Sequence, residues 1–382
     1  MKTVAAISML AGTLMLATAA AAQTPITPPA AKSEPKAEPK PEAKKTAPAA
    51  RKPAVPETKP ASPPPAATAT PAPTDPNVDM VYGAFQRGEY KTTLELAIPR
   101  AQAGDPKAMT MIGEIYSNGF GVKRDFAKAV EWYKRASDAG DREAMFALAM
   151  MRIAGRGGPV DKQDAVRLLA SAAKLGEPKA AYNLALLYLD GQTLPQDLRR
   201  SAELLRLAAD AGNPEAQYAL ATFYKEGTGV EKDLEKAARL LQAASLADNI
   251  DAEVEYAIAL FNGTGVPRNQ PAAVALLRKA AKHNNPIAQN RLARVLVSGM
   301  GVPMDKVEGF KWHLVAKTAG KGDPELDVEF TKLTPEERAK AEALAHRWLG
   351  DTLDASARKG QPVPQTLPAP QAAVPQAGAP TR

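Results

Sequence analysis

The stretch AMTMIGEIYSNGFGVKRDFAKAVEWYKRASDAGD, residues 108–141, decides the fold, because its pattern returns five more times at a spacing of 36 residues. The spacing holds in three rows of small residues: Ala108, Ala144, Ala180, Ala216, Ala252 and Ala288; Gly119, Gly155, Gly191, Gly227, Gly263 and Gly299; and Ala136, Ala172, Ala208, Ala244, Ala280 and Ala316. A constant period over six copies predicts supersecondary units that bury their apolar faces only by stacking on one another.

Each copy predicts a helix, a turn and a second helix. The first helix begins after a short polar residue, at Asp105, Asp141, Glu177, Asn213, Asn249 or Asn285, and four of these precede a proline, at Pro106, Pro178, Pro214 and Pro286. Such a residue followed by proline is a helix start signal. The glycine row ends the first helix, because glycine readily adopts the left-handed backbone conformation.

A row of acidic or amide side chains opens the second helix of each copy: Asp125, Asp161, Asp197, Asp233, Asn269 and Asp305. Because each of them follows the turn at the same offset, we expect them to cap helices and not to form a catalytic acid array. Trp132 and Trp312 share one repeat offset with leucines in other copies, so we expect them to pack in the core.

The first copy resembles the Sel1-like repeat, a relative of the tetratricopeptide repeat, at Tyr116, Gly119, Gly121, Val122, Asp125, Lys128, Ala129, Trp132, Ala136 and Gly140. The resemblance, to the exported bacterial type, implies an all-α, right-handed α-solenoid of about six repeats, at 108–143, 144–179, 180–215, 216–251, 252–287 and 288–323. Copies two and three depart from the pattern in their turns, GRGGPVD and GQTLPQD, where we expect local bends. We expect capping helices at 78–107 and a C-terminal capping helix at 324–350, where Thr334 and Glu337 form a capping box.

The first 22 residues predict a secretory signal peptide, with Lys2, an apolar run and small residues before a cleavage site near Ala22 and Gln23. The apolar run is shorter than the roughly 20 residues of a spanning helix, so we expect no stable membrane span after cleavage. The protein is then expected to be periplasmic or secreted. With no cysteine in the chain, it has no disulfide and no thiol chemistry.

Two proline-rich segments flank the predicted repeats. Residues 23–77 hold sixteen prolines among Ala, Lys and Glu, and we expect them to be a disordered, extended spacer. The spacer is either a solvated leader or a segment whose lysines make weak contact with the anionic cell wall. Residues 351–382 predict a second disordered tail.

The sequence has no pattern typical of catalysis, metal binding or nucleic-acid binding. Most of the formal net charge of +7 lies outside the repeats, so the array lacks the basic stripe that nucleic acid requires. His283, His313 and His346 are far apart, and the chain carries no nucleophile or phosphate-loop motif. We therefore expect no enzyme, no cofactor and no metal.

Two functions remain. The favoured one is a secreted or periplasmic protein–protein interaction scaffold, or regulatory adaptor, with a protein partner in the cell envelope, since Sel1-like proteins are similar to such adaptors. The alternative is a protein that binds or modifies peptidoglycan. By analogy with related arrays, the first helices would line the concave side. The candidate partner-binding residues are non-repeating positions of these helices: Glu114, Asn183, Glu226, Glu255, Asn262, Arg291 and Arg294. Glu255 and Arg291, one period apart, could instead pair with each other.

Overall fold

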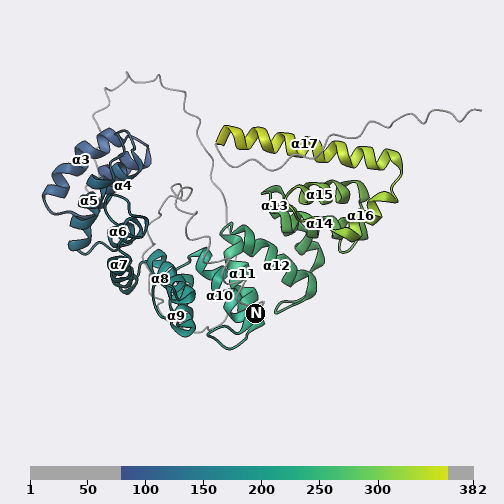
Figure 1. Ribbon diagram of the computed structural model, residues 1–382, viewed down its shortest axis with the longest axis horizontal. Coiled ribbons are helices and arrows are strands. Elements are labelled where there is room, and N and C mark those ends of the chain that lie inside the picture. The colour runs from purple at the N-terminus through teal and green to yellow at the C-terminus, as the bar shows by residue number, and fades with distance from the viewer. Residues whose placement is uncertain (1–78, 360–382) are drawn as a thin grey trace, which may run out of the picture.

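The computed structural model describes residues 79–359, with side chains to residue 351, and this part of the chain is all α-helix. Figure 1 shows the helices stacked in a curved array. The first helices of the repeats are α4 (Pro106–Asn118), α6 (Arg142–Ala154), α8 (Pro178–Asp190), α10 (Pro214–Glu226), α12 (Ile250–Asn262) and α14 (Pro286–Ser298). The second helices are α5 (Phe126–Asp138), α7 (Lys162–Lys174), α9 (Leu198–Asp210), α11 (Leu234–Leu246), α13 (Gln270–Lys282) and α15 (Lys306–Thr318). The all-α solenoid predicted from the period is confirmed.

The predicted signals start and stop every first helix. All six N-cap side chains accept a backbone hydrogen bond, for example from the Ala216 amide to Asn213 Oδ1 at 2.7 Å. All six glycines of the repeat row are C-caps in the left-handed conformation. The caps satisfy backbone groups that a helix end leaves without partners, which fixes the helix length.

The acidic or amide row before the second helices is structural, as predicted. Each of its six side chains accepts from the backbone amide three residues further on. At Asp233, for example, Oδ1 accepts from the Lys236 amide at 2.9 Å. The row therefore caps α5, α7, α9, α11, α13 and α15.

The core runs along the array between the two layers of helices. The repeated alanines are fully or almost fully buried, which lets neighbouring helices approach closely. Each first helix packs mainly on its own second helix and then on the second helix of the preceding repeat. Trp312 is buried in the core of the C-terminal repeats and Trp132 packs, partly buried, against the core of the N-terminal repeats, as expected from their shared offset.

The two ends of the array differ in how well the sequence predicts them. At the N-terminal end, α2 (Met80–Gln86) and α3 (Tyr90–Gln102) meet at Gly88, as predicted. At the C-terminal end, the single expected helix over 324–350 is instead two helices, α16 (Pro324–Thr331) and α17 (Pro335–Lys359). The predicted capping box is present, since Thr334 and Glu337 exchange hydrogen bonds at the start of α17.

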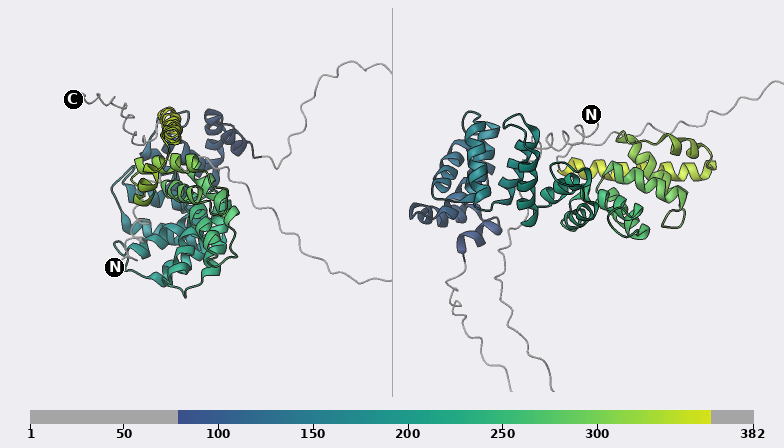
Figure 2. Two further views of the ribbon diagram at one scale, coloured as in Figure 1. Left: turned by 90° about the vertical axis from the view of Figure 1, so that its right-hand side faces the viewer. Right: turned by 90° about the horizontal axis from the view of Figure 1, so that it is seen from below.

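The helix α17 continues past residue 350, into the segment expected to be a disordered tail. It packs along α15, where the rings of Trp348 and Trp312 meet edge to face with centroids 5.0 Å apart. Figure 2 shows α17 lying against the last repeat from two further directions. Its contact with α15 covers the core where the repeats stop.

The predicted signal peptide, the proline-rich spacer and the end of the tail lie outside the described residues. Within residues 79–359, no helix combines the length and the apolar character that crossing a membrane requires.

Candidate functional site: the inner face of the first helices

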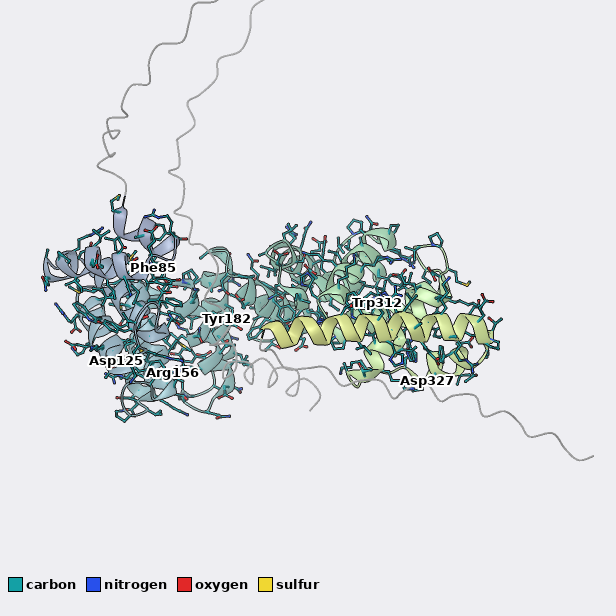
Figure 3. All side chains as sticks on the ribbon, turned by 90° about the horizontal axis from the view of Figure 1, so that it is seen from above. Phe85, Asp125, Arg156, Tyr182, Trp312 and Asp327 are labelled. Atoms are coloured by element: carbon teal, nitrogen blue, oxygen red, sulfur yellow. The ribbon has the colours of Figure 1, made fainter. Side chains whose placement is uncertain are left out.

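The first helices face the inside of the curve in the first three repeats. Glu114 lies on α4 and Lys179 on α8, two repeats further along, yet the positive charge of Lys179 acts on the Glu114 carboxyl. Side chains two repeats apart come close to each other only on the concave side of a curved array, where successive helices converge. The side of the first helices is therefore the inner face, which Figure 3 views from above with Tyr182 near its middle.

Glu114 sits in a confined part of this face. Its carboxyl is partly buried, and burial is the largest cause that raises its pKa, while Lys179 acts to lower it and Glu143 to raise it. The three side chains come from α4, α6 and α8. One ligand lying on the inner face would thus contact several repeats at once.

On the first helices that follow, from α8 to α12, two tyrosines alternate with carboxylates. Tyr182 is the fifth residue of α8, and Glu215 is the second residue of α10; Tyr218 and Asp251 stand in the same relation on α10 and α12. We call these four side chains the tyrosine–carboxylate face. Burial, and then the neighbouring carboxylates, raise the pKa of Tyr182 and of Tyr218 to about 12 each.

The tyrosine hydroxyls of this face have unused hydrogen-bonding capacity. Both rings are half-buried, and neither hydroxyl has a hydrogen-bond partner in the described part of the chain. The charge of Glu215 acts on Tyr182, and those of Glu255 and Asp251 act on Tyr218. The carboxylates of one repeat therefore lie beside the ring of the repeat before it.

Three of the predicted partner-binding residues are available for contact. Arg291 and Asn262 are exposed and Glu114 is partly buried, and among the side chains described, up to residue 351, none of the three forms an ion pair or a hydrogen bond. Arg291 lies on α14 and Asn262 at the end of α12.

The other four are occupied or enclosed. Asn183 is only 9% exposed and donates to the carbonyl of Lys179 in its own helix at 2.8 Å. Arg294 pairs with Asp323 at the start of α16, so it holds the C-terminal cap. One carboxylate oxygen of Glu226 is buried and has no hydrogen-bond partner in the described residues.

Glu255, the remaining candidate, does not pair with Arg291. Its carboxylate is 2.9 Å from the Lys225 ammonium, which joins α12 to α10. The Glu255–Arg291 pair, which the sequence left open as an alternative, does not form, because Lys225, seven residues after Tyr218, reaches the same carboxylate from the preceding repeat. Arg291 is left without a counter-charge among the residues described here.

Sequence reasoning missed the tyrosine–carboxylate face. It searched for positions that do not repeat, whereas Tyr182 and Tyr218 repeat with the period. Glu215 and Asp251 looked like ordinary first-turn acids that favour a helix start. The signal that could have found them is the pairing of an aromatic ring with an acid at fixed offsets in consecutive copies.

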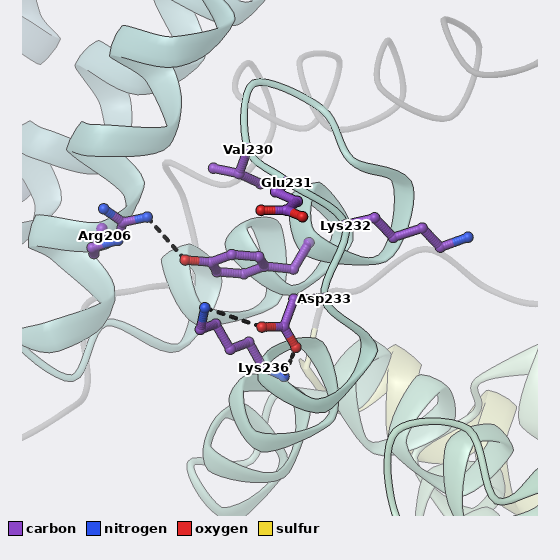
Figure 4. A pocket seen from close by; sticks show the side chains of 7 residues that line it. Arg206, Val230, Glu231, Lys232, Asp233 and Lys236 are labelled. Atoms are coloured by element: carbon purple, nitrogen blue, oxygen red, sulfur yellow. Dashed lines mark hydrogen bonds and ion pairs between the residues drawn. The ribbon is translucent and has the colours of Figure 1, made fainter.

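A cavity of about 440 Å³ lies on a different surface, beside the turn of the fourth repeat (Figure 4). Four of its polar side chains are already bonded: Arg206 donates to the Tyr224 hydroxyl at 2.9 Å, and Lys236 pairs with Asp233 at 3.0 Å. The first repeat places Tyr116, Lys128 and Asp125 in a similar arrangement. The cavity is thus part of the capping structure.

The described residues also contain no group of three His, Asp or Glu side chains placed to hold a metal ion. His313 is fully buried and bonds Asp327 at 2.9 Å, which ties α15 to α16. The histidine therefore has a packing role in the C-terminal cap.

Comparisons with known proteins agree with this architecture. A family model described as the Sel1 repeat matches residues 106–141, 142–177, 178–213, 214–249, 250–285 and 286–321. These windows keep the 36-residue period and begin two residues before the repeats read from the sequence. A search of curated proteins found no match.

Two solved structures are similar. A Sel1 repeat protein from Oxalobacter formigenes is 27% identical, with a TM-score of 0.57, over 64% of this chain and 100% of that one. A protective antigen present in uropathogenic Escherichia coli strains is 23% identical, with a TM-score of 0.50, over 76% of this chain and 74% of that one. The second likeness concerns the fold alone.

Proposed function

The chain belongs to the Sel1 repeat family, whose members generally mediate protein–protein interaction, and from this we propose that it is a secreted or periplasmic interaction scaffold. In this proposal it acts as an adaptor that holds a protein of the cell envelope along the inner face of its first helices. Contacts spread over several repeats give such a surface its specificity.

One observation carries the proposal: Glu114 on α4 is partly buried and lies within reach of the positive charge of Lys179 on α8, two repeats further along. An inner face this confined lets one extended partner segment contact three first helices at once. The exposed Arg291 extends the candidate surface to the sixth repeat.

Sel1 repeat scaffolds are generally non-enzymatic, and we propose the same for this chain. The cavity beside the fourth turn supports this, because Asp233, Lys236, Arg206 and Tyr224 in it bond to one another and Asp233 caps α11. The peptidoglycan-binding alternative has no comparable support among the described residues, so it enters as an outcome of the test.

The proposed location rests on residues 1–22, which have the pattern of a secretory signal. Fractionation of cells that express the tagged chain tests it. We expect a periplasmic or secreted product whose N-terminal sequence begins at Gln23. An uncleaved product in the cytoplasm would exclude the location.

The binding test compares two charge reversals. Arg291→Glu changes the exposed, unpaired cation on the first helix α14, whereas Lys162→Glu reverses an exposed charge at the start of α7, a second helix. The full chain and both variants are cross-linked in cell-envelope extract, and the captured proteins are compared. We expect one protein to be captured by the wild type and by Lys162→Glu but lost with Arg291→Glu, while both variants melt like the wild type.

Two results would contradict the proposal. One is capture that is the same for all three proteins, because it would remove the first helix of the sixth repeat from the interface. The other is saturable co-sedimentation of the wild-type chain with purified peptidoglycan in the absence of any other protein, which would favour the cell-wall alternative.

A further inference from the structure

Resting on the proposed function, we infer that the tyrosine–carboxylate face receives an extended segment of the protein partner that is rich in lysine or arginine. The face consists of Tyr182, Glu215, Tyr218 and Asp251 on α8, α10 and α12. The inference names the chemistry of the partner segment, which the scaffold proposal leaves open.

The order of the tyrosine and carboxylate side chains along the array supports a cationic partner segment. Each tyrosine is followed by the carboxylate of the next repeat, so a segment that lies along the inner face meets ring, acid, ring and acid in turn. A cationic side chain suits both kinds of group. Its ammonium or guanidinium pairs with a carboxylate, and it also lies favourably over an aromatic face.

The uncompensated negative charge of the tyrosine–carboxylate face also favours a cationic segment. Among the side chains of residues 79–351 the Glu215 carboxylate has no ion pair, and Asp251 accepts only from the Asn285 side-chain amide at 3.3 Å. Lys225, on the same helix as Tyr218, is already paired with Glu255. The face therefore carries negative charge that the described residues do not neutralise, and a positively charged segment complements it.

The two tyrosine rings favour lysine or arginine over a small cation. Their half-buried rings give a fixed apolar surface for the methylene stem of a lysine or arginine, and their unbonded hydroxyls accept hydrogen bonds from its head. A carboxylate alone would attract any cation. The combination selects a long cationic side chain.

The test uses a defined probe: a fluorescein-labelled peptide of about twelve residues in which lysine alternates with alanine, an extended spacing of charges on one side. A peptide with glutamate in place of lysine is the probe control. Binding to the full-length chain is followed by fluorescence anisotropy at about 50 mM salt, where screening of charges is weak.

We expect saturable binding of the lysine peptide only. Glu215→Gln combined with Asp251→Asn should weaken it by on the order of tenfold. Glu235→Gln is the matched control, because Glu235 is also a first-turn acid but lies on the second helix α11.

Tyr182→Leu with Tyr218→Leu should weaken binding, whereas replacing both tyrosines with phenylalanine should keep most of it, because the rings remain. Melting curves check that each variant is folded.

Equal loss of affinity in the Glu235→Gln control and in the double carboxylate variant would overturn the inference, because binding would then follow overall charge. A second contrary result involves residues 23–77, which hold eight basic residues. If the lysine peptide binds only after those basic residues are replaced by alanine, the occupant is this chain's own segment and not a partner.

The two proposals can fail separately. Lys162→Ala should leave binding of the lysine peptide unchanged, because Lys162 is an exposed residue of the second helix α7 and is not part of the tyrosine–carboxylate face. If capture from extract depends on Arg291 but the lysine peptide does not bind, the scaffold stands and the assignment of a basic segment is wrong. If the peptide binds with the expected variant dependence but no protein is captured, the scaffold proposal is the one that fails.

Discussion

Gly265 lies against the carbonyl oxygen of Leu234, the first residue of the preceding second helix, so closely that a Cβ at position 265 would overlap that oxygen. Gly229 stands in the same relation to Leu198 one repeat earlier. The second glycine of the turn thus sets how closely consecutive repeats stack. Gly265 also has a φ of 69°, which disfavours any side chain.

Gly265→Ala should therefore destabilise the array more than a glycine replacement that meets only the backbone penalty. Gly212 is the matched control, with a φ of 84° and no atom within 4 Å of an added Cβ. We expect Gly212→Ala to cost about 1 kcal/mol. Gly265→Ala should cost a further 1–3 kcal/mol or so, because the repeats must move apart. Urea unfolding of both variants measures the difference, and equal midpoints would show that the stacking tolerates the methyl group.

The period explains why so much of the fold could be predicted from sequence. Caps such as Asn213 and C-cap glycines such as Gly227 act within one turn of backbone, so local sequence suffices to place them. The C-terminal end lacks a repeat register, and there the break between α16 and α17 was missed. It lies at Lys332 and Leu333, just before the capping box that was recognised.

The partner-binding face was harder to predict, because it depends on which charges meet across repeats. Sequence spacing placed Glu255 and Arg291 at one offset, but it could not show that Lys225 reaches Glu255 first. Nor could it show that Asn183 turns back to its own helix. Side-chain direction and curvature decide both, and neither follows from the period.

The Lys225–Glu255 pair predicts a specific rescue. Glu255→Lys places two ammonium groups together between α10 and α12, and since both side chains are about a third exposed or more, we expect a loss of at most about 1 kcal/mol. Adding Lys225→Glu should restore the melting temperature. Adding Arg291→Glu to Glu255→Lys should not restore it, and if it does, Glu255 and Arg291 are the true pair.

Trp348 should hold α17 on the last repeat. Its ring meets Trp312, and the Lys311 ammonium lies 4.0 Å and 4.7 Å from the centroids of the Trp312 and Trp348 rings. Because Trp348 is only partly buried, Trp348→Ala should cost about 2 kcal/mol, less than a fully buried tryptophan. The loss should be local, since each unit of the array contacts only its neighbours.

Hydrogen exchange measures that local loss. Trp348→Ala should speed exchange in α17 and α15 while leaving α4 to α8 unchanged, and the neighbouring exposed Arg347→Ala is the control. Unchanged exchange in α17 would mean that other contacts hold the helix. Faster exchange throughout would mean that the array unfolds as one unit.

The cap at Asp233 should make one helix start sensitive to acid. The Lys236 backbone amide, and then the Lys236 ammonium, hold the pKa of the Asp233 carboxyl below its usual value. A carboxyl whose pKa is lower in the folded state stabilises that state above its unfolded pKa of about 3.9, and the stabilisation is lost as the pH falls through the folded value. Asp233→Asn keeps an acceptor but cannot titrate. Its melting temperature should lie at or below that of the wild type at about pH 7, and the difference should shrink or reverse below about pH 4.

Asn269 caps α13 at the same offset in the next repeat and gives the reciprocal test. Asn269→Asp introduces a titrating cap, so it should melt at or above the wild type near neutral pH and fall behind it below about pH 4. No lysine stands three residues after position 269, so this cap has only the Ala272 amide to stabilise its charge. The pH effect should therefore be smaller than at Asp233. Differences that do not change with pH in either variant would show that these carboxylates do not act through their charge.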